Sequence, residues 1–162
     1  MLFRSEQTVG IRFPGLQLDA GRTLGSAHLQ FTSKEAGNAP TELVIRAQAA
    51  DTAPAILAGN HDLSSRALTT AAVRWTVPPW TKADDAGAAQ RTPDLSPLLR
   101  EVLSRPGWQP GNAICFIITG TGKRVAWSAD GKAAAAPLLQ IAMEKTAAQL
   151  AAAPPVRKRW LR

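Results

Sequence analysis

The sequence is poor in the residues that most often build catalytic and metal sites. Its 162 residues include one cysteine, two histidines and no tyrosine. A single thiol excludes a disulfide within the chain, and the apolar surroundings of Cys115 in AICFIITG predict a buried, unreactive side chain. His28 and His61 are too few for a histidine-rich metal cluster. Stability must therefore come from packing, and we expect no catalytic residues, no metal and no cofactor.

Long apolar runs are also missing. No stretch approaches the roughly 18–20 apolar residues that a membrane-spanning helix needs. The first residues, MLFRSEQTVG, contain no extended apolar region and no small-residue cleavage site. We therefore expect no secretory signal and no membrane partner, with synthesis in the cytoplasm.

Positive charge gathers at one end of the chain. The net charge is +7, and four of these charges lie in the last six residues. The remaining body is nearly balanced and lacks the basic stripe that is typical of a nucleic-acid surface. The candidate partner-binding residues are Arg157, Lys158, Arg159, Trp160 and Arg162. Docking into an acidic protein and a solvated chain end remain equal alternatives, with nucleic acid behind both.

Apolar and polar residues alternate along most of the chain, which indicates half-buried β-strands. The run NAICFIITGTG is instead continuously apolar, which predicts a central strand covered on both faces. The tight turn at residues 120–122 predicts a hairpin from this strand to the next. The alternating stretches are QTVGIRFPG, GSAHLQFTS, TELVIRAQA, AAVRWTVPPW, KRVAWSADG and AAAPLLQIAM.

One short helix interrupts the strands. Leucine and valine recur at helical spacing between Leu95 and Leu103, Asp94 or Ser96 can cap the start, and Pro106 follows the end. A helix of about ten residues is not stable alone in water, so tertiary contacts must hold it. We expect it to plug one end of a β-sandwich.

The predicted fold is therefore all-β: an antiparallel, jelly-roll-like β-sandwich with one short helix and a C-terminal extension. Residues 1–142 form the sandwich domain, and residues 143–162 form an alanine-rich helix and the basic tail. Short strands separated by turn residues are typical of this class.

Six segments, spread over residues 6–142, resemble in order the DNRLRE-type and carbohydrate-binding-module-like jelly rolls of bacterial surface proteins and phage virions. The segments are TVGIRF, GSAHLQF, SSRALTTAAVRW, QRTPDLSPLLREVLSRPGW, GNAICFIITGTGKRVAWSADG and APLLQI. The resemblance implies a non-catalytic module with no catalytic residues to carry over. Such modules usually begin with a further segment, whose absence would leave a strand edge open.

Two functions compete on these grounds. The first is a structural or interaction module of a larger assembly, specifically a head-decoration or head–tail component of a phage virion, acting as a homo-oligomer or with other subunits. The alternative is a carbohydrate-binding module on the cell surface or outside the cell, binding a polysaccharide.

The predicted exposure of each tryptophan indicates whether it could stack on a sugar ring. Trp75 and Trp127 fall in phase with core positions and are predicted to be buried, and Trp108 is expected to pack under the helix. Trp80 follows two prolines and is the tryptophan predicted to be exposed, which makes it the candidate carbohydrate-binding residue. Its alternative role is an anchor folded onto the sandwich.

Three further motifs give weaker indications of a functional site. GTGKR at residues 120–124 lacks the first glycine and the final Ser or Thr of a phosphate loop. His61 and Asp62 have no nucleophile motif beside them, and solvated loop residues are the better interpretation. Asp84 and Asp85 could contact calcium, but their spacing matches no calcium loop.

Overall fold

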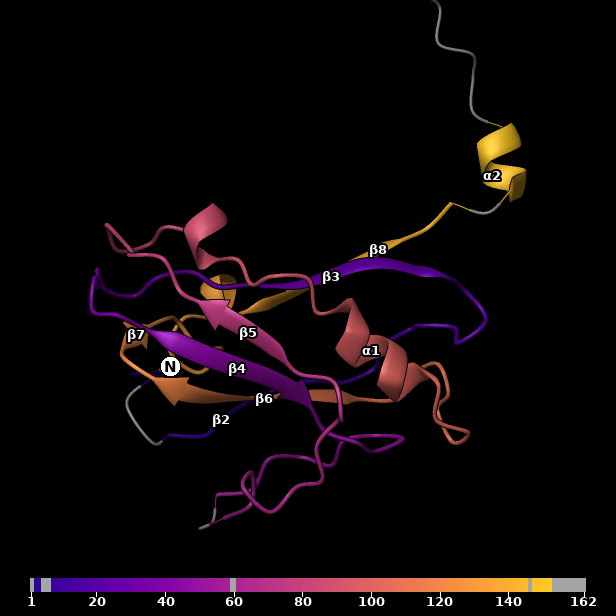
Figure 1. Cartoon of the computed structure of the whole chain (residues 1–162), viewed down its shortest axis with the longest axis horizontal. Coiled ribbons are helices and arrows are strands. Elements are labelled where there is room, and N and C mark those ends of the chain that lie inside the picture. The colour runs from indigo at the N-terminus through magenta and orange to yellow at the C-terminus, as the bar shows by residue number, and fades with distance from the viewer. Residues whose placement is uncertain (1, 4–6, 59–60, 146, 153–162) are drawn as a thin grey trace, which may run out of the picture.

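The computed structural model describes residues 2–3, 7–58, 61–145 and 147–152 (Figure 1). The described elements are β1 (Leu2–Phe3), β2 (Val9–Phe13), β3 (Leu24–Gln30), β4 (Glu42–Ala47), β5 (Val73–Thr76), the 3-10 turn η1 (Ala88–Gln90), α1 (Ser96–Leu103), β6 (Ile114–Thr121), β7 (Arg124–Val125), η2 (Ala133–Ala135), β8 (Leu138–Met143) and α2 (Ala147–Ala151).

The strands form antiparallel sheets, as the sequence predicts. One sheet has the order β2-β6-β4-β5, β3 pairs with β8, and β1 pairs with β7. In Figure 1, β3 and β8 lie above the sheet that contains β4, β5 and β6. The all-β, sandwich-like fold is therefore confirmed.

The main core lies between these sheets, where the predicted inward residues meet. Leu29 and Ile45 are fully buried, and the ring of Phe31 stacks on Trp75 with 5.9 Å between the centroids. The predicted burial of Trp75 is confirmed, because only 4% of this residue is exposed. Side chains from both layers therefore share one apolar interior.

Strand β6 is covered on both faces, as its apolar sequence predicts. Phe116 faces the main core, whereas Cys115 and Ile117 belong to a second buried cluster with Ala53 and Ala113. Ala53, in the segment after β4, belongs to this outer cluster, and its N–H donates to the Ala113 carbonyl at 2.8 Å. Burial raises the pKa of the Cys115 thiol.

The predicted helix is present as α1 and packs against β3 and β4, one strand from each sheet. Its leucines at positions 98 and 99 are fully buried. Asp94 accepts hydrogen bonds from the N–H and hydroxyl of Ser96 at the helix start. Trp108 is 94% buried after the helix, as expected, and its indole donates to the Leu18 carbonyl at 3.0 Å. The helix is thus a plug at one end of the sandwich.

The predicted hairpin after β6 is wrong. Both sides of β6 are already occupied by β2 and β4, so β7 pairs with β1 instead. Gly122 has φ +95°, and a Cβ at this position would lie 2.3 Å from the Pro40 carbonyl oxygen. The glycine-rich turn therefore brings the chain close to the start of β4 and leads it out of the sheet.

Segment 125–127 then pairs with residues 32–34 and places Ala126, rather than Trp127, in the core. Trp127 is only half-buried, so its predicted burial is wrong by one residue of strand phase.

Met143, the first residue of the predicted extension, is the last residue of β8, and α2 follows it. No helix in the described part of the chain has the length and apolarity to cross a bilayer. The candidate residues Arg157, Lys158, Arg159, Trp160 and Arg162 lie outside the described residues.

Candidate interaction edges

Strand edges are the main unsatisfied feature of the described structure. Strands β2 and β5 end the four-stranded sheet, and β8 ends its own sheet beside β3. An open edge presents unpaired backbone N–H and C=O groups, which can bind a strand of another chain.

The hydrogen bonds of β3 show which groups of β8 are free. Ala27 and Leu29 bond with residues 92–95 on one side, so the alternating residues His28 and Gln30 bond with β8 on the other. Their partners are Gln140 and Leu138. The odd-numbered residues of β8 therefore direct their backbone groups away from β3, and no described residue pairs with them.

The same reasoning applies to β2. Gln48 N–H donates to the Cys115 carbonyl, so the odd-numbered residues of β6 bond toward β4 and the even-numbered ones toward β2. This arrangement leaves the backbone groups of Gly10 and Arg12 on the free edge.

The inward side chains on this side are incompletely covered. Leu139, Ile141 and Met143 of β8 are only half-buried, although they pack against the main core. The inward residues of neighbouring β3, Ala27 and Leu29, are fully buried. The apolar interior therefore reaches the surface along β8.

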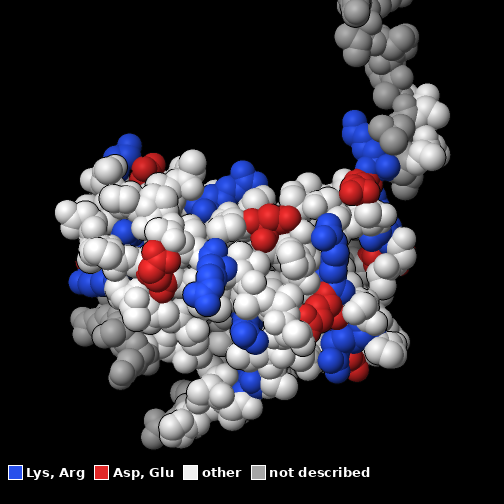
Figure 2. Space-filling model, viewed as in Figure 1, with Lys and Arg blue, Asp and Glu red and all other residues white. Residues whose placement is uncertain are grey.

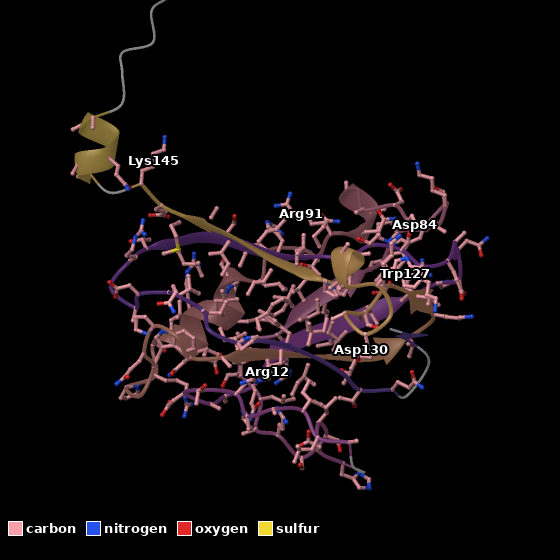
Figure 3. The ribbon with its side chains drawn as sticks, turned by 180° about the vertical axis from the view of Figure 1, so that it is seen from behind. Arg12, Asp84, Arg91, Trp127, Asp130 and Lys145 are labelled. Atoms are coloured by element: carbon pink, nitrogen blue, oxygen red, sulfur yellow. The ribbon has the colours of Figure 1, made fainter. Side chains whose placement is uncertain are left out.

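The two incomplete edges face the same side of the molecule. A hollow of about 220 Å³ is lined by residues 10–13 of β2 and by residues 128, 129, 136 and 137, which lead into β8. Figure 3 views the molecule from this side and labels Arg12 on β2 and Lys145 beyond β8. We call this surface, bounded by the free edges of β2 and β8, the open side.

The edges differ in how well they are protected. Strand β5 has four residues, carries Arg74 and is followed by Pro78 and Pro79, and β2 carries Arg12. Charge, proline and short length all discourage edge pairing. The β8 sequence LLQIAM has six residues and contains neither charge nor proline, although Pro137 directly precedes it.

Trp80 does not have the exposure that sugar stacking requires. Only 1% of the residue is exposed, and its indole donates to the Ala89 carbonyl at 2.9 Å. The backbone of Trp80 also pairs with Gly37 in both directions. The predicted exposure is wrong: Trp80 is an anchor that fixes its loop to the sandwich.

The exposed part of Trp127 is surrounded by charge. The ammonium groups of Lys34 and Lys132 lie 5.0 and 5.3 Å from its ring centroid, and its indole donates to Asp84 at 2.9 Å. Hydrogen bonds from Lys132 and Trp127 hold the pKa of the Asp84 carboxyl below its ordinary value. These contacts tie together residues far apart in the sequence.

The other sequence candidates are not assembled into a site. The Asp62 carboxylate accepts bonds from Leu57 N–H and Arg66, and these bonds lower its pKa. His28 donates from Nδ1 to the Thr92 carbonyl at 2.9 Å. Within the described ranges, no three His, Cys, Asp or Glu side chains are grouped to hold a metal ion.

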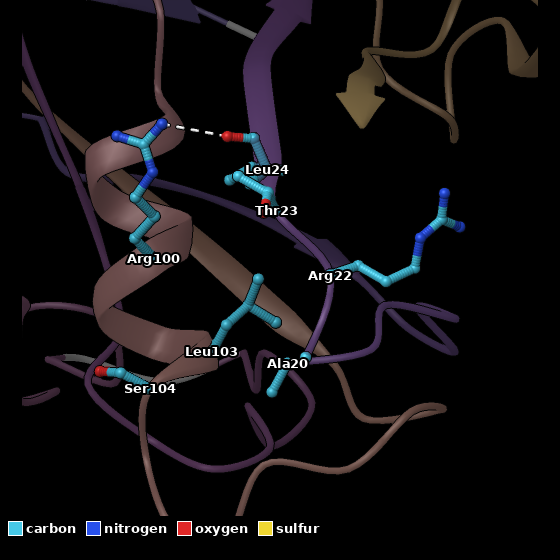
Figure 4. Close-up of a pocket in the computed structure, with 8 residues that line it drawn as sticks. Ala20, Arg22, Thr23, Leu24, Arg100, Leu103 and Ser104 are labelled. Atoms are coloured by element: carbon cyan, nitrogen blue, oxygen red, sulfur yellow. Dashed lines mark hydrogen bonds between the residues drawn. The ribbon is translucent and has the colours of Figure 1, made fainter. Parts of the chain in front are cut away.

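A hollow of about 300 Å³ lies between α1 and the start of β3 (Figure 4). The Arg100 guanidinium on its wall donates to the Leu24 carbonyl at 3.0 Å, and Arg22 points away from the other lining residues. Figure 2 shows Lys and Arg interspersed with Asp and Glu on one face of the molecule. The two arginines in Figure 4 point apart, and Figure 2 shows no patch of charges of one sign.

Sequence reasoning missed one buried group. Arg124 is 98% buried, and its guanidinium donates to four backbone carbonyls and to the Thr41 hydroxyl. Burial lowers its pKa. Its position in GTGKR gave no indication of this role, because every acceptor except the Lys123 carbonyl comes from the distant segments 39–41 and 77–78.

Comparison with protein-family models, with curated proteins and with solved structures found no match to this chain.

Proposed function

We propose that this chain is a non-catalytic structural module that joins a larger protein assembly through its open side. The observation that carries the proposal is the coincidence of two free strand edges with a half-buried apolar interior on one side of the sandwich. A strand added there would satisfy backbone groups and cover Leu139 and Ile141.

The particular assembly that we propose is a virion, in which the chain is a head-decoration or head–tail component. The support is the resemblance of the six sequence segments to modules found among virion proteins. Detection of the chain in purified virions at a fixed ratio to capsid protein is the expected result.

The general proposal is tested by the native size of the tagged chain in its own cells. Wild-type protein should elute from a gel-filtration column well above its monomer mass of 17.2 kDa. Lysine at both Gln140 and Ala142, which are exposed on β8, should move it to smaller size because the new charges oppose strand addition.

The matched control is Thr119→Lys. Thr119 is also an exposed strand residue, but β6 has neighbours on both sides. This variant should elute like the wild type. Elution of the wild-type protein as a monomer, or equal behaviour of the two variants, would contradict the proposal.

A further inference from the structure

Strand β8 has the properties of a strand that pairs with itself. Its six residues contain no charged side chain, so two copies of the strand can approach without repulsion between them. Most natural free edges carry charge or proline to prevent this contact. The free edges of β2 and β5 each contain an arginine, whereas β8 contains none.

The side-chain pattern of β8 is also self-complementary. In antiparallel pairing about a two-fold axis, odd-numbered residues of one copy lie opposite odd-numbered residues of the other. The half-buried residues Leu139, Ile141 and Met143 of both copies therefore fall on the same, inner face. The exposed residues Gln140 and Ala142 fall together on the outer face.

The free backbone groups fit the same arrangement. They belong to the odd-numbered residues of β8, and a two-fold axis at Gln140 or at Ile141 places such residues opposite one another. The first register pairs Leu139 with Ile141 of the second copy. The second pairs Ile141 with itself and Leu139 with Met143.

Charges near the two ends of β8 favour the antiparallel sense. Asp130 lies on the loop that precedes η2 and β8, and Lys145 lies beyond the end of the strand (Figure 3). Neither side chain has an ion-pair partner within the described residues. Antiparallel pairing places the two Lys145 side chains, and the two Asp130 side chains, at opposite ends of the joined strands, whereas parallel pairing would bring like charges together.

We infer that this protein forms a two-fold dimer in which β8 of one copy pairs with β8 of a second copy and extends the β3–β8 sheet across both. This inference rests on the proposed function and names the partner of its open side. The contact is isologous, so it closes at two copies and leaves the β2 edges free for other subunits.

The salt dependence of dimerisation distinguishes pairing of two β8 strands from docking through opposite charges. Each copy carries a net charge of +7, so two copies repel each other at low ionic strength. Because the paired strands are uncharged, added salt should strengthen the dimer. A dimer held by the basic tail on an acidic surface would instead weaken.

Analytical ultracentrifugation of the purified full chain over a range of concentrations tests the inference. We expect a monomer–dimer equilibrium that added salt shifts toward the dimer. The double variant Gln140→Lys/Ala142→Lys should raise the dissociation constant by roughly tenfold or more, because like charges meet across the axis. Thr119→Lys should leave the constant unchanged, and both variants should keep the wild-type melting temperature at low concentration.

The register can be trapped with a disulfide, because Cys115 is the only native cysteine and is fully buried. Gln140→Cys alone should form a disulfide-linked dimer if the axis passes through Gln140. A mixture of the Gln140→Cys and Ala142→Cys chains should form the mixed dimer if the axis passes through Ile141.

Three results would overturn the inference: a monomer at every concentration, a dimer unaffected by the double lysine variant, or a dimer that neither cysteine design links. A purified monomer that still enters a larger complex in cells, and leaves it with the double variant, would reject the dimer. It would leave the proposed function standing, with a different protein as the partner of β8.

Discussion

At the scale of single residues, Arg124 shows how this fold uses a charge without an opposite charge. Its guanidinium forms no ion pair with the described carboxylates and instead donates to surrounding carbonyl oxygens. A planar group with five N–H donors can satisfy such a cage, whereas an ammonium group has three donors and a different geometry. Arg124 thereby joins the chain before β4 to the chain after β5.

Replacement of Arg124 by lysine is expected to destabilise the protein by about 3 kcal/mol. The smaller head group leaves buried carbonyl oxygens without donors. For a chain of this length the melting temperature should fall by roughly 6–12 °C, which calorimetry can measure. Arg91→Lys, at an exposed position, is the control and should change little. Equal melting temperatures for Arg124→Lys and Arg91→Lys would show that the hydrogen bonds of Arg124 contribute nothing to stability.

At the scale of elements, the start of α1 depends on one carboxylate. Asp94 accepts hydrogen bonds from Ala27 N–H at 2.8 Å and from Ser96, so it attaches the first residue of the helix to β3. Partial burial acts to raise the pKa of Asp94, but these hydrogen bonds outweigh it and hold the pKa below the ordinary value of 3.8. The charged form therefore stabilises the folded state.

Asp94→Asn should cost about 1 kcal/mol at neutral pH, because a charged carboxylate accepts stronger hydrogen bonds than a neutral amide oxygen. Because the folded-state pKa is depressed, the wild-type advantage is complete above pH 3.8 and disappears as pH falls through the lower folded-state pKa. Urea unfolding of both proteins across this range measures the difference. The difference in unfolding free energy should shrink in acid.

At the scale of the whole molecule, the core ends with β8. Every residue of the main core, buried or partly buried, lies between Val9 and Met143. Strand β8 ends at Met143, and the alanine-rich α2 follows it. Folding stability and assembly can therefore reside in different parts of the chain.

Deletion of residues 154–162 should leave the melting temperature within about 1 °C of the wild type, because the described core has no member beyond Met143. If the basic residues contact an acidic partner, the same deletion should reduce the size of the native assembly in gel filtration. A large loss of thermal stability would show instead that this segment packs on the sandwich.

The sequence alone determined the phase of most strands, the helix and the fold class, but it placed Trp127 one residue out of phase. These features follow from local periodicity, since alternation buries Leu29 and Ile45 and helical spacing buries Leu98 and Leu99. Periodicity, however, cannot state which strand lies beside which. The predicted hairpin failed for that reason, because β2 and β4 occupy both sides of β6.

Only the tertiary structure decided which tryptophans are exposed and which edges are free. Trp80 is buried by residues distant in the sequence, Gly37 and Ala89, and Trp127 is half-exposed because its neighbour Ala126 enters the core. The free edge of β8 could not be predicted either, because the sequence LLQIAM is compatible with one neighbouring strand or with two. Burial and pairing depend on long-range contacts, and local sequence does not encode them.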